Sequence, residues 1–502
     1  MARRRARTRA ENGVAASASS RRVTPLGGRF TPCSEMDLAR IERAAYTILE
    51  TIGMSNLPEH FVARARRHGA VLRGDGRICF PPALVDAARA RAPCRVSLPG
   101  FSGGSSLEIG GAGVHIGTGG AAVQVLDAHS MEYRDSSLGD LFDIMRLLDA
   151  APHIAYGVRP LVARDMPDGL SLDLNTAFAC LKATSKPIGV SFSSPDHVAP
   201  VVELFDMALG GGVCFRERPF AMAVIVHAVP PLAFASEGVE TLAAALSAGM
   251  VPQICSAGQV GATSPVTLAG ALAQGLAECL AGLVLVDMIA PGAPCIYALM
   301  PFVSDLRTGA MAGGSGEGAI ASAAAAQLLA GLGLPSTVSA GMTDAKIADA
   351  QAGYEKGYTV ALAAQAGADM INLSVGMLGS IMVASPEALL IDDDMCGAIL
   401  RSVEGIDAAD ALIDLEAIER VVTGEGHYLA EAETFRRMRS DFVYPALGDR
   451  RSVDDWLAAG GHSIWERACT RASDILSSEM SDHLALENER AIRARFPIHL
   501  PE

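Results

Sequence analysis

The sequence predicts an α/β fold: a (β/α)8 TIM barrel with a helical N-terminal domain, a β-hairpin cap and a helical C-terminal extension. Three observations predict it. Half of the 502 residues are hydrophobic but only 5% are aromatic, a composition typical of buried parallel strands covered by Ala-rich helices. Short apolar runs alternate with Ala-rich helical segments eight times. Because such barrels take about 250 residues or more, the chain has room for appended segments at both ends.

Three segments precede the predicted barrel. Residues 1–30 are predicted to be a disordered arm, because no apolar stretch of the about 7–15 residues found in export signals follows the basic start. Residues 31–96 are predicted to form a helical N-terminal domain, in which Ile41 and Ala45 lie on one apolar stripe. Residues 97–120 contain nine glycines and two alternating runs, so we expect a β-hairpin that covers one end of the barrel.

The barrel itself is predicted to span residues 121–405. The eight expected strands are residues 121–126, 154–158, 187–192, 221–227, 251–256, 295–299, 336–340 and 370–374. The eight expected helices are residues 137–150, 171–184, 196–209, 237–248, 267–290, 317–332, 349–366 and 386–402. Residues 406–502 are predicted to be a helical extension that wraps the flank or the mouth of the barrel.

Composition excludes several classes of function. The net charge of −15 argues against a nucleic-acid surface. Ten cysteines without a C-x-x-C pair indicate reduced thiols in a cytoplasmic protein. The histidines are spread out with no H-x-x-x-H, so we expect no metal site. The apolar segment 268–291 contains Gln274, Glu278 and Asp287, so a buried helix is expected there rather than a membrane span.

The segment 334–357 is a buried strand, a polar loop and the start of a helix. In α/β barrels the loops that leave the carboxyl ends of the strands carry the chemistry, so we expect this loop at the mouth. Two of its residues have open alternatives, since Asp344 can either cap the helix or line the mouth, and Lys346 can either face a ligand or solvent. Gln351 and Glu355 lie one turn apart on the helix, where they either brace that face or contact a ligand.

Several runs together resemble the trimethylamine methyltransferase superfamily, and the resemblance extends from about residue 22 to 476. They are residues 264–274 with 277–282, 291–297, 304–309 with 316–317, 342–346 with 349–355, and 424–429. The family usually shows two glycines before the histidine of the last run, and Glu425 replaces the first of them here.

The resemblance implies a barrel that moves a methyl group from a methylated amine to the cobalt of a separate corrinoid protein docked over the mouth. Founding members of the family carry pyrrolysine and use trimethylamine. No pyrrolysine is written in this chain, so the resemblance points to the branch that acts on quaternary amines such as glycine betaine. We expect no tightly bound cofactor, because no cobalamin-binding segment is appended.

A quaternary ammonium leaves as a neutral tertiary amine, so its demethylation needs no acid, base or covalent intermediate. We therefore expect no catalytic residue in the strict sense, and a protein that acts by positioning. Aromatic faces are expected around the cation. The candidates, each of which can instead be a packed core residue, are Phe192, His227, Tyr297 and Phe302, with Tyr354 and Tyr358 on the following helix.

The remaining expected site residues are polar. Arg307 either binds a substrate carboxylate or pairs with Asp305 to brace a loop. Residues expected to bind substrate with it are Thr343, Asp344, Lys346, Gln351 and Glu355. At the mouth or behind it we expect Asp127, Asp305, Glu317 and His427.

Two alternatives remain open at this stage. The chain could be a non-catalytic subunit that binds or senses quaternary amines, or a barrel of this family with another one-carbon acceptor. The expected partners are the small quaternary amine, the corrinoid protein and further copies of the chain as a homo-oligomer, with no nucleic acid and no membrane.

Overall fold

The computed structural model describes residues 25–409, 412–424 and 426–501. Most of the predicted arm, residues 1–30, therefore lies outside the described residues. The core is a parallel sheet of eight strands that follow one another in chain order. They are β5 (His115–Ile116), β8 (Gly157–Val158), β9 (Ile188–Val190), β10 (Ala221–Val226), β13 (Val251–Ser256), β15 (Ile296–Leu299), β17 (Ser336–Ser339) and β18 (Met370–Asn372). A parallel bridge between Gly117 and Tyr156 joins the two end strands and closes the barrel.

The first barrel strand differs from the predicted one. β5 takes that place, six residues before the predicted strand at 121–126, and pairs with β18. Residues 121–126 instead contain β6 (Gln124–Leu126), which lies in a second sheet with β7 (Tyr133–Asp135), β19 (Met377–Leu378) and β20 (Val383–Ala384). Glycines on both sides of β5 interrupt the apolar pattern that would predict a strand from the sequence. They are needed there, because a Cβ on Gly117 would lie 2.3 Å from the Tyr156 ring.

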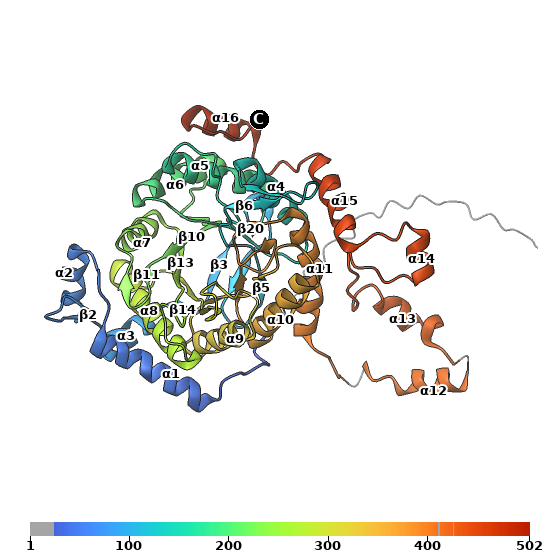
Figure 1. Cartoon of the computed structure of the whole chain (residues 1–502), viewed down its shortest axis with the longest axis horizontal. Coiled ribbons are helices and arrows are strands. Elements are labelled where there is room, and N and C mark those ends of the chain that lie inside the picture. The colour runs from blue at the N-terminus through green and yellow to red at the C-terminus, as the bar shows by residue number, and fades with distance from the viewer. Residues whose placement is uncertain (1–24, 410–411, 425, 502) are drawn as a thin grey trace, which may run out of the picture.

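A ring of eight helices covers the barrel, as predicted (Figure 1). They are α4 (Leu138–Ala150), α5 (Gly169–Ala183), α6 (Val198–Leu209), α7 (Ser236–Ala248), α8 (Leu268–Ile289), α9 (Gly316–Gly331), α10 (Ala350–Ala366) and α11 (Pro386–Glu404). α8 is the one helix of the described chain with the length and hydropathy of a membrane span, and 89% of its most apolar window is buried inside the protein. That burial is the packing of a core helix, as the polar residues within it predict.

The N-terminal region packs beneath and beside the barrel. It contains α1 (Glu35–Thr47), a π-helical turn η1 (Ile48–Ile52), α2 (Glu59–Arg67), β1 (Val71–Leu72), β2 (Ile78–Cys79) and α3 (Pro82–Arg91). An antiparallel hairpin is present as β3 (Val96–Leu98) and β4 (Leu107–Ile109). Of the two alternating runs that predicted it, residues 107–109 lie in this hairpin, but residues 114–116 contain the barrel strand β5 instead. The apolar side chains of the hairpin pack against Met222, Val251 and Ile296 inside the barrel. The hairpin thus plugs the amino-terminal end of the barrel and leaves the carboxyl end for function.

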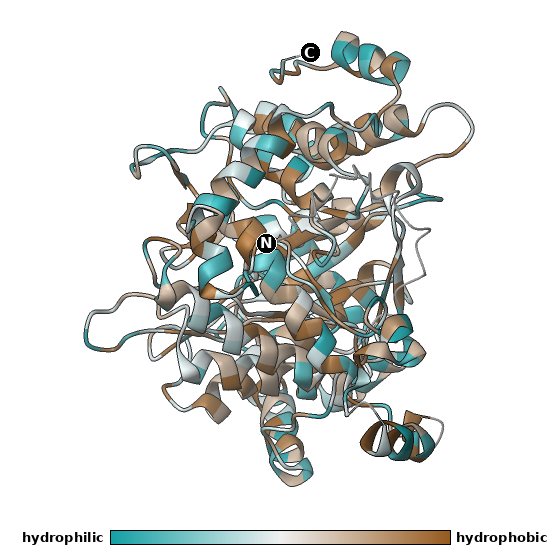
Figure 2. Cartoon of the chain, turned by 90° about the vertical axis from the view of Figure 1, so that its right-hand side faces the viewer, coloured by the Kyte–Doolittle hydropathy of each residue, from teal (hydrophilic) through white to brown (hydrophobic). Residues whose placement is uncertain are grey.

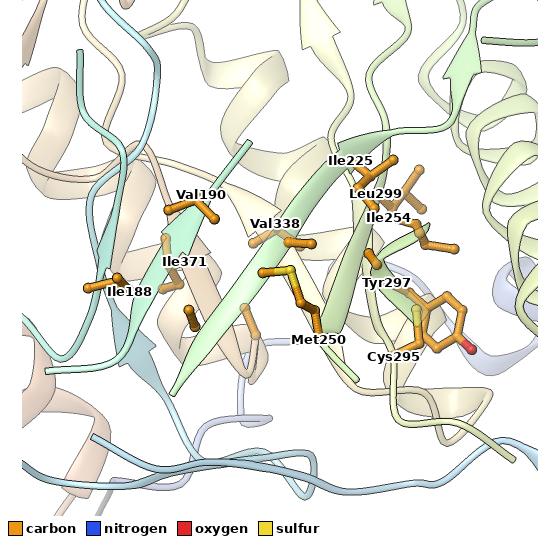
Figure 3. Packing of buried hydrophobic residues seen from close by; sticks show 14 of the residues in the cluster. Ile188, Val190, Ile225, Met250, Ile254, Cys295, Tyr297, Leu299, Val338 and Ile371 are labelled. Carbon is orange, nitrogen blue, oxygen red and sulfur yellow. The ribbon is translucent and has the colours of Figure 1, made fainter. Parts of the chain in front are cut away.

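Strand alternation sorts the side chains of the barrel into two sets. Ile188, Val190, Ile225, Ile254 and Val338 belong to the large cluster that the strands share with the surrounding helices (Figure 3). The inner set includes a buried polar layer, in which Tyr156 donates a hydrogen bond to Oδ1 of Asn372 at 2.6 Å. Thr337 donates to Gln253 in the same layer.

The C-terminal extension divides into two parts. α15 (Ile464–Ser477) packs against α4 and α11, and α16 (Leu486–Arg495) packs against α6. The preceding helices α12 (Leu415–Thr423), α13 (Ala432–Arg437) and α14 (Val453–Ala458) lie outside the ring of barrel helices (Figure 1). The side view shows that the C-terminal end of the chain lies at the edge of the molecule, beside its last helix (Figure 2). The extension therefore covers the flank only in part.

Candidate functional site at the mouth of the barrel

The loop after β17 carries a cluster of hydrogen-bonded polar side chains. Oε2 of Glu355 accepts hydrogen bonds from the Thr343 hydroxyl at 2.5 Å and from the Asp344 backbone at 2.8 Å. Oε1 accepts from the Gln351 amide at 2.9 Å. Glu355 and Thr343 are both buried. The predicted residues of this loop and helix therefore lie together, with Glu355 at their centre.

Asp344 fixes the glycine-rich loop that follows β15. Its Oδ1 accepts from the backbone of Gly313 at 2.9 Å and from the hydroxyl of Ser380. Asp349, and not Asp344, is the N-cap of α10, since its side chain accepts from Gln351 and Ala352. Asp344 lies too far before the helix to reach those amides, so its interpretation as a helix cap is wrong.

Lys346 lies on the exposed rim of the mouth. Its Nζ donates to the backbone oxygen of Asp344 at 2.6 Å, and its own carbonyl accepts from Tyr133 at 2.8 Å. This arrangement ties the loop to β7 and leaves the ammonium group in contact with solvent. Lys346 does not point into a buried pocket.

A small hollow beside this cluster contains the best-placed aromatic candidate. Phe302, on β16 (Phe302–Val303), packs over Cys255, Ala298 and Met300 at the inner face of the barrel. Phe302 also lines the hollow with Ser339, whose buried hydroxyl has no hydrogen-bond partner. The other lining residues include Val303, Met311, Gly313, Met342 and Thr359.

Two tyrosines from α10 lie near the same place. Tyr358 donates to the backbone oxygen of Gly314, and Tyr354 is 60% exposed. Burial raises the pKa of Tyr358, and the negative charges of Glu355, Glu317 and Asp344 raise it further. The same carboxylates make this part of the mouth attractive to a cation.

His227 and Tyr297 are not at the mouth. His227 is fully buried against α8, where its Nε2 lies 2.9 Å from the carbonyl of Glu278, and burial lowers its pKa. Tyr297 is 1% exposed and lies among outward-facing strand residues such as Ile254 and Leu299 (Figure 3). Both follow from strand alternation, because neighbouring positions on a strand face opposite sides of the sheet.

The other predicted residues are scattered around the rim. Phe192 is partly buried after β9, and Glu317 is exposed in the first turn of α9. Asp127 holds the turn between β6 and β7 through hydrogen bonds from His129 and Ser130.

Two further predicted sites lie at the surface. Arg307 is exposed and forms a two-point pair with Asp305, which lowers the pKa of Asp305 to about 2. His427 is exposed at the start of a short 3-10 helix in the extension, and its neighbour Glu425 lies outside the described residues.

Sequence reasoning missed two features of the site. Ser339 was taken only as part of a buried strand, and nothing in its surroundings in the sequence marks its hydroxyl as unpaired. Gly314 lies so close to Glu355 that a Cβ there would approach its Cδ to 2.3 Å. The glycine density of 309–318 was visible in the sequence, but the packing partner was not. No group of three or more potential metal ligands occurs among the residues placed by the structure.

Comparisons with known proteins agree with this architecture. The family model for trimethylamine methyltransferase (MTTB) matches residues 1–496. A glycine betaine methyltransferase of Desulfitobacterium hafniense is 29% identical over 470 residues, which cover 93% of this chain and 96% of that protein. A trimethylamine methyltransferase of Methanosarcina barkeri is 32% identical over 407 residues, covering 80% and 81%.

Among solved structures, the chain is similar to the monomethylamine methyltransferase of Methanosarcina barkeri. The two share 12% identity with a TM-score of 0.44, over 90% of this chain and 96% of the other. The match of the family model over nearly the whole sequence, together with the closed eight-stranded barrel, leads to one conclusion. The chain belongs to the trimethylamine methyltransferase family.

Proposed function

We propose that this methyltransferase moves a methyl group from a quaternary amine of the betaine type to the Co(I) centre of a separate corrinoid protein. The hollow at the carboxyl end of the barrel encloses about 10 Å³, room for about one water molecule, so it has to widen to admit an amine. The observation that carries the proposal is the set of groups around this hollow. It combines the aromatic ring of Phe302 and the unpaired hydroxyl of Ser339 with the nearby carboxylates of Asp344 and Glu355. An aromatic face beside fixed negative charge is the environment that a quaternary ammonium prefers.

In this reaction the protein has little to do beyond positioning the amine for attack by cobalt. When Co(I) attacks the methyl carbon, the electron pair of the C–N bond stays on nitrogen and a neutral tertiary amine leaves. No proton has to move. All the donors around Glu355 point at its two oxygens, so this carboxylate acts as a rigid acceptor that shapes the mouth.

The corrinoid protein, which accepts the methyl group, has to approach the mouth from outside the barrel. Asp344, Tyr358 and the glycine-rich loop form the wall of the mouth, and their mutual hydrogen bonds hold the opening in one shape. The amine would sit with one methyl group toward the opening and its remaining substituents toward Phe302. In this proposal Arg307 braces its loop through Asp305 and does not anchor the substrate.

The absence of pyrrolysine supports a quaternary substrate over trimethylamine. The chain is similar to relatives named for either substrate, with 29% identity to a glycine betaine methyltransferase and 29% to a trimethylamine methyltransferase of Desulfitobacterium hafniense. The test is to mix the purified protein with a Co(I) corrinoid protein and a panel of betaines and simple amines, and to follow the cobalt absorption spectrum. Methylation of cobalt with a betaine supports the proposal. Binding of the amine without any change at cobalt would instead favour the alternative of a non-catalytic binding or sensor subunit.

A further inference from the structure

Arg159 is a cation without a bound partner at the carboxyl end of the barrel. It directly follows β8, and its backbone nitrogen continues the parallel ladder by donating to the carbonyl of Gly189 at 3.0 Å. Because the barrel strands are parallel, the end of β8 lies at the same rim as Phe302 and Glu355. Within the described parts of the chain, no hydrogen bond or ion pair reaches the guanidinium group, whose Nε is buried.

The surroundings of Arg159 are unusual for an unpaired charge. Burial lowers the pKa of Arg159, yet its side chain is still partly exposed. A side chain that is deep in the protein and still in contact with solvent lies at the wall of an opening. Because a guanidinium withdrawn from water without a partner destabilises the fold, a ligand that supplies a carboxylate would relieve a cost that the protein already carries.

The carboxylate of Asp173 on α5 attracts Arg159, but the two groups are not hydrogen-bonded. Oδ2 of Asp173 instead accepts from the backbone and the hydroxyl of Ser193 at 2.8 and 2.9 Å, and lies 2.7 Å from Nδ1 of His197. Asp173 thereby holds the loop after β9. Its Oδ1 is buried without a partner. Even if a water molecule joins this oxygen to Nε of Arg159, the two terminal nitrogens of the guanidinium remain available to another anion.

The barrel is open to solvent close to this residue. Val226, at the end of β10, pairs in register with Cys255 and therefore faces the interior of the barrel, as Cys255 does. The side chain of Val226 is nonetheless 54% exposed, so solvent enters the barrel at this end. Only β9 lies between β10 and β8. The opening is therefore next to the strand that carries Arg159.

The barrel is also narrow enough for one small molecule to reach two of its walls. Thr337 of β17 donates to Gln253 of β13 although β15 lies between these strands, and the interior of an eight-stranded barrel is filled by side chains alone. β8 and β15 stand on opposite sides of the ring. A ligand with its cationic group at Phe302 can thus place an anionic group at Arg159.

We propose that Arg159 binds the carboxylate of the substrate. The terminal N–H groups of a guanidinium match the two oxygens of a carboxylate, a geometry that neither a lysine nor a neutral amide offers. The substrates are therefore quaternary amines that also carry a carboxylate, and amines without one bind weakly. Of the substituents on nitrogen, the one with the carboxylate turns from Phe302 toward β8. This inference rests on the proposed function, because it assigns the second group of the same substrate.

The first test compares acids with their methyl esters in calorimetric titrations of the full-length protein. The acids are trimethylammonium carboxylates with one, two or three methylene groups between the nitrogen and the carboxylate. The wild type should bind at least one acid about 10- to 150-fold more tightly than its ester, the range expected for hydrogen bonds to a charged group. Equal affinities for acid and ester at every spacing would overturn the proposal.

The second test assigns the preference to Arg159. In Arg159→Gln the affinity for the acid should fall to that for the ester, while the affinity for the ester stays unchanged; a variant that is merely destabilised loses both ligands alike. Arg159→Lys, which keeps the charge without the two-point geometry, should retain part of the preference and replaces Arg159→Gln if that variant does not fold. The matched control is Arg164→Gln, which changes an exposed arginine paired with Asp135 and should keep the full preference.

Two results of the second test would contradict the assignment. One is a full preference for the acid in Arg159→Gln or in Arg159→Lys. The other is loss of the preference in Arg307→Gln instead, which would return the role to the arginine on the loop after β15.

Both tests measure binding without a corrinoid protein, so they separate this inference from the proposed reaction. Loss of the acid preference in Arg159→Gln, together with no methyl transfer by the wild type, would support Arg159 and contradict the reaction. Methyl transfer from a betaine by a wild type that binds acid and ester equally would support the reaction and contradict the role of Arg159.

Discussion

The hydroxyl of Thr343 lies 2.5 Å from Oε2 of Glu355, and the backbone nitrogen of Asp344 lies 2.8 Å from the same oxygen. The amide of Gln351 and, at 3.5 Å, the hydroxyl of Tyr354 donate to Oε1, so four donors converge on one buried carboxylate. This convergence joins the loop after β17 to the helix that follows it. The shape of the mouth therefore depends on a group that only accepts hydrogen bonds.

Glu355→Gln should lower both stability and substrate binding. The NH2 group of the new amide would face one or more of the groups that now donate to the carboxylate, which costs about 1–3 kcal/mol of unfolding free energy. Loss of the negative charge should also raise KM for a cationic amine. Urea unfolding and steady-state kinetics measure the two effects. The control for stability is Glu317→Gln, which changes an exposed residue at the start of α9 and should alter the free energy of unfolding little. Equal losses of stability in the two variants would contradict this role for Glu355.

Gly314→Ala tests the close approach of the glycine-rich loop. The added methyl group would collide with the Glu355 side chain, and overpacking of this kind costs about 1–3 kcal/mol and shifts the backbone. Both the rate of methyl transfer and the melting temperature should decrease in this variant. Gly316→Ala is a matched control, because nothing lies within 4 Å of a Cβ there. If Gly314→Ala retained wild-type activity and melting temperature, the loop would not be held as described.

Phe302→Leu tests the aromatic contact with the substrate. Loss of a cation–π interaction of about 0.5–2 kcal/mol should raise KM for a quaternary amine about 2- to 30-fold, with a smaller effect on folding. Tyr297→Phe should leave KM unchanged, because Tyr297 packs on the outer side of the strands. An increase in KM for Tyr297→Phe but not for Phe302→Leu would contradict the assignment of the aromatic substrate contact to Phe302.

Ser339→Ala should have opposite effects on stability and binding. Because the hydroxyl is buried without a partner, its removal should leave the free energy of unfolding unchanged or raise it by up to about 1 kcal/mol. If this hydroxyl contacts the amine, KM should increase at the same time. Thermal unfolding and kinetics of the same preparation check both. An unchanged KM would remove Ser339 from the site.

Asp149 provides a prediction for pH. Burial alone would raise its pKa, but hydrogen bonds from His483, Thr184 and Ser185 outweigh burial and lower the pKa to about 2. A carboxyl whose pKa is lowered in the folded state stabilises the fold above its unfolded pKa of about 3.9, and this contribution is lost as the pH falls toward 2. The free energy of unfolding of the wild type should therefore be about 1–2 kcal/mol higher than that of Asp149→Asn at pH 6. This difference should become smaller between pH 4 and pH 3. A constant difference over that range would contradict the assignment.

Much of the fold could be predicted from the sequence, because buried parallel strands and Ala-rich helices leave a strong local pattern. The prediction failed at β5, where two residues between glycines carry the pairing and the closure depends on Gly117 meeting Tyr156. Thr343 and Glu355 lie together as their closeness in the chain predicts, and their contact with a substrate stays a prediction. His227 and Tyr297 could not be placed, since a strand of uncertain register does not show which side chains face the helices.

The measurement that tests the central claim most directly is the cobalt spectrum of a Co(I) corrinoid protein mixed with this protein and a betaine. We expect methylation of cobalt with a quaternary amine, a rate reduced in Phe302→Leu, and no reaction when the barrel protein is omitted. Methylation with trimethylamine but with no quaternary amine, or no methylation with any amine of the panel, would contradict the account.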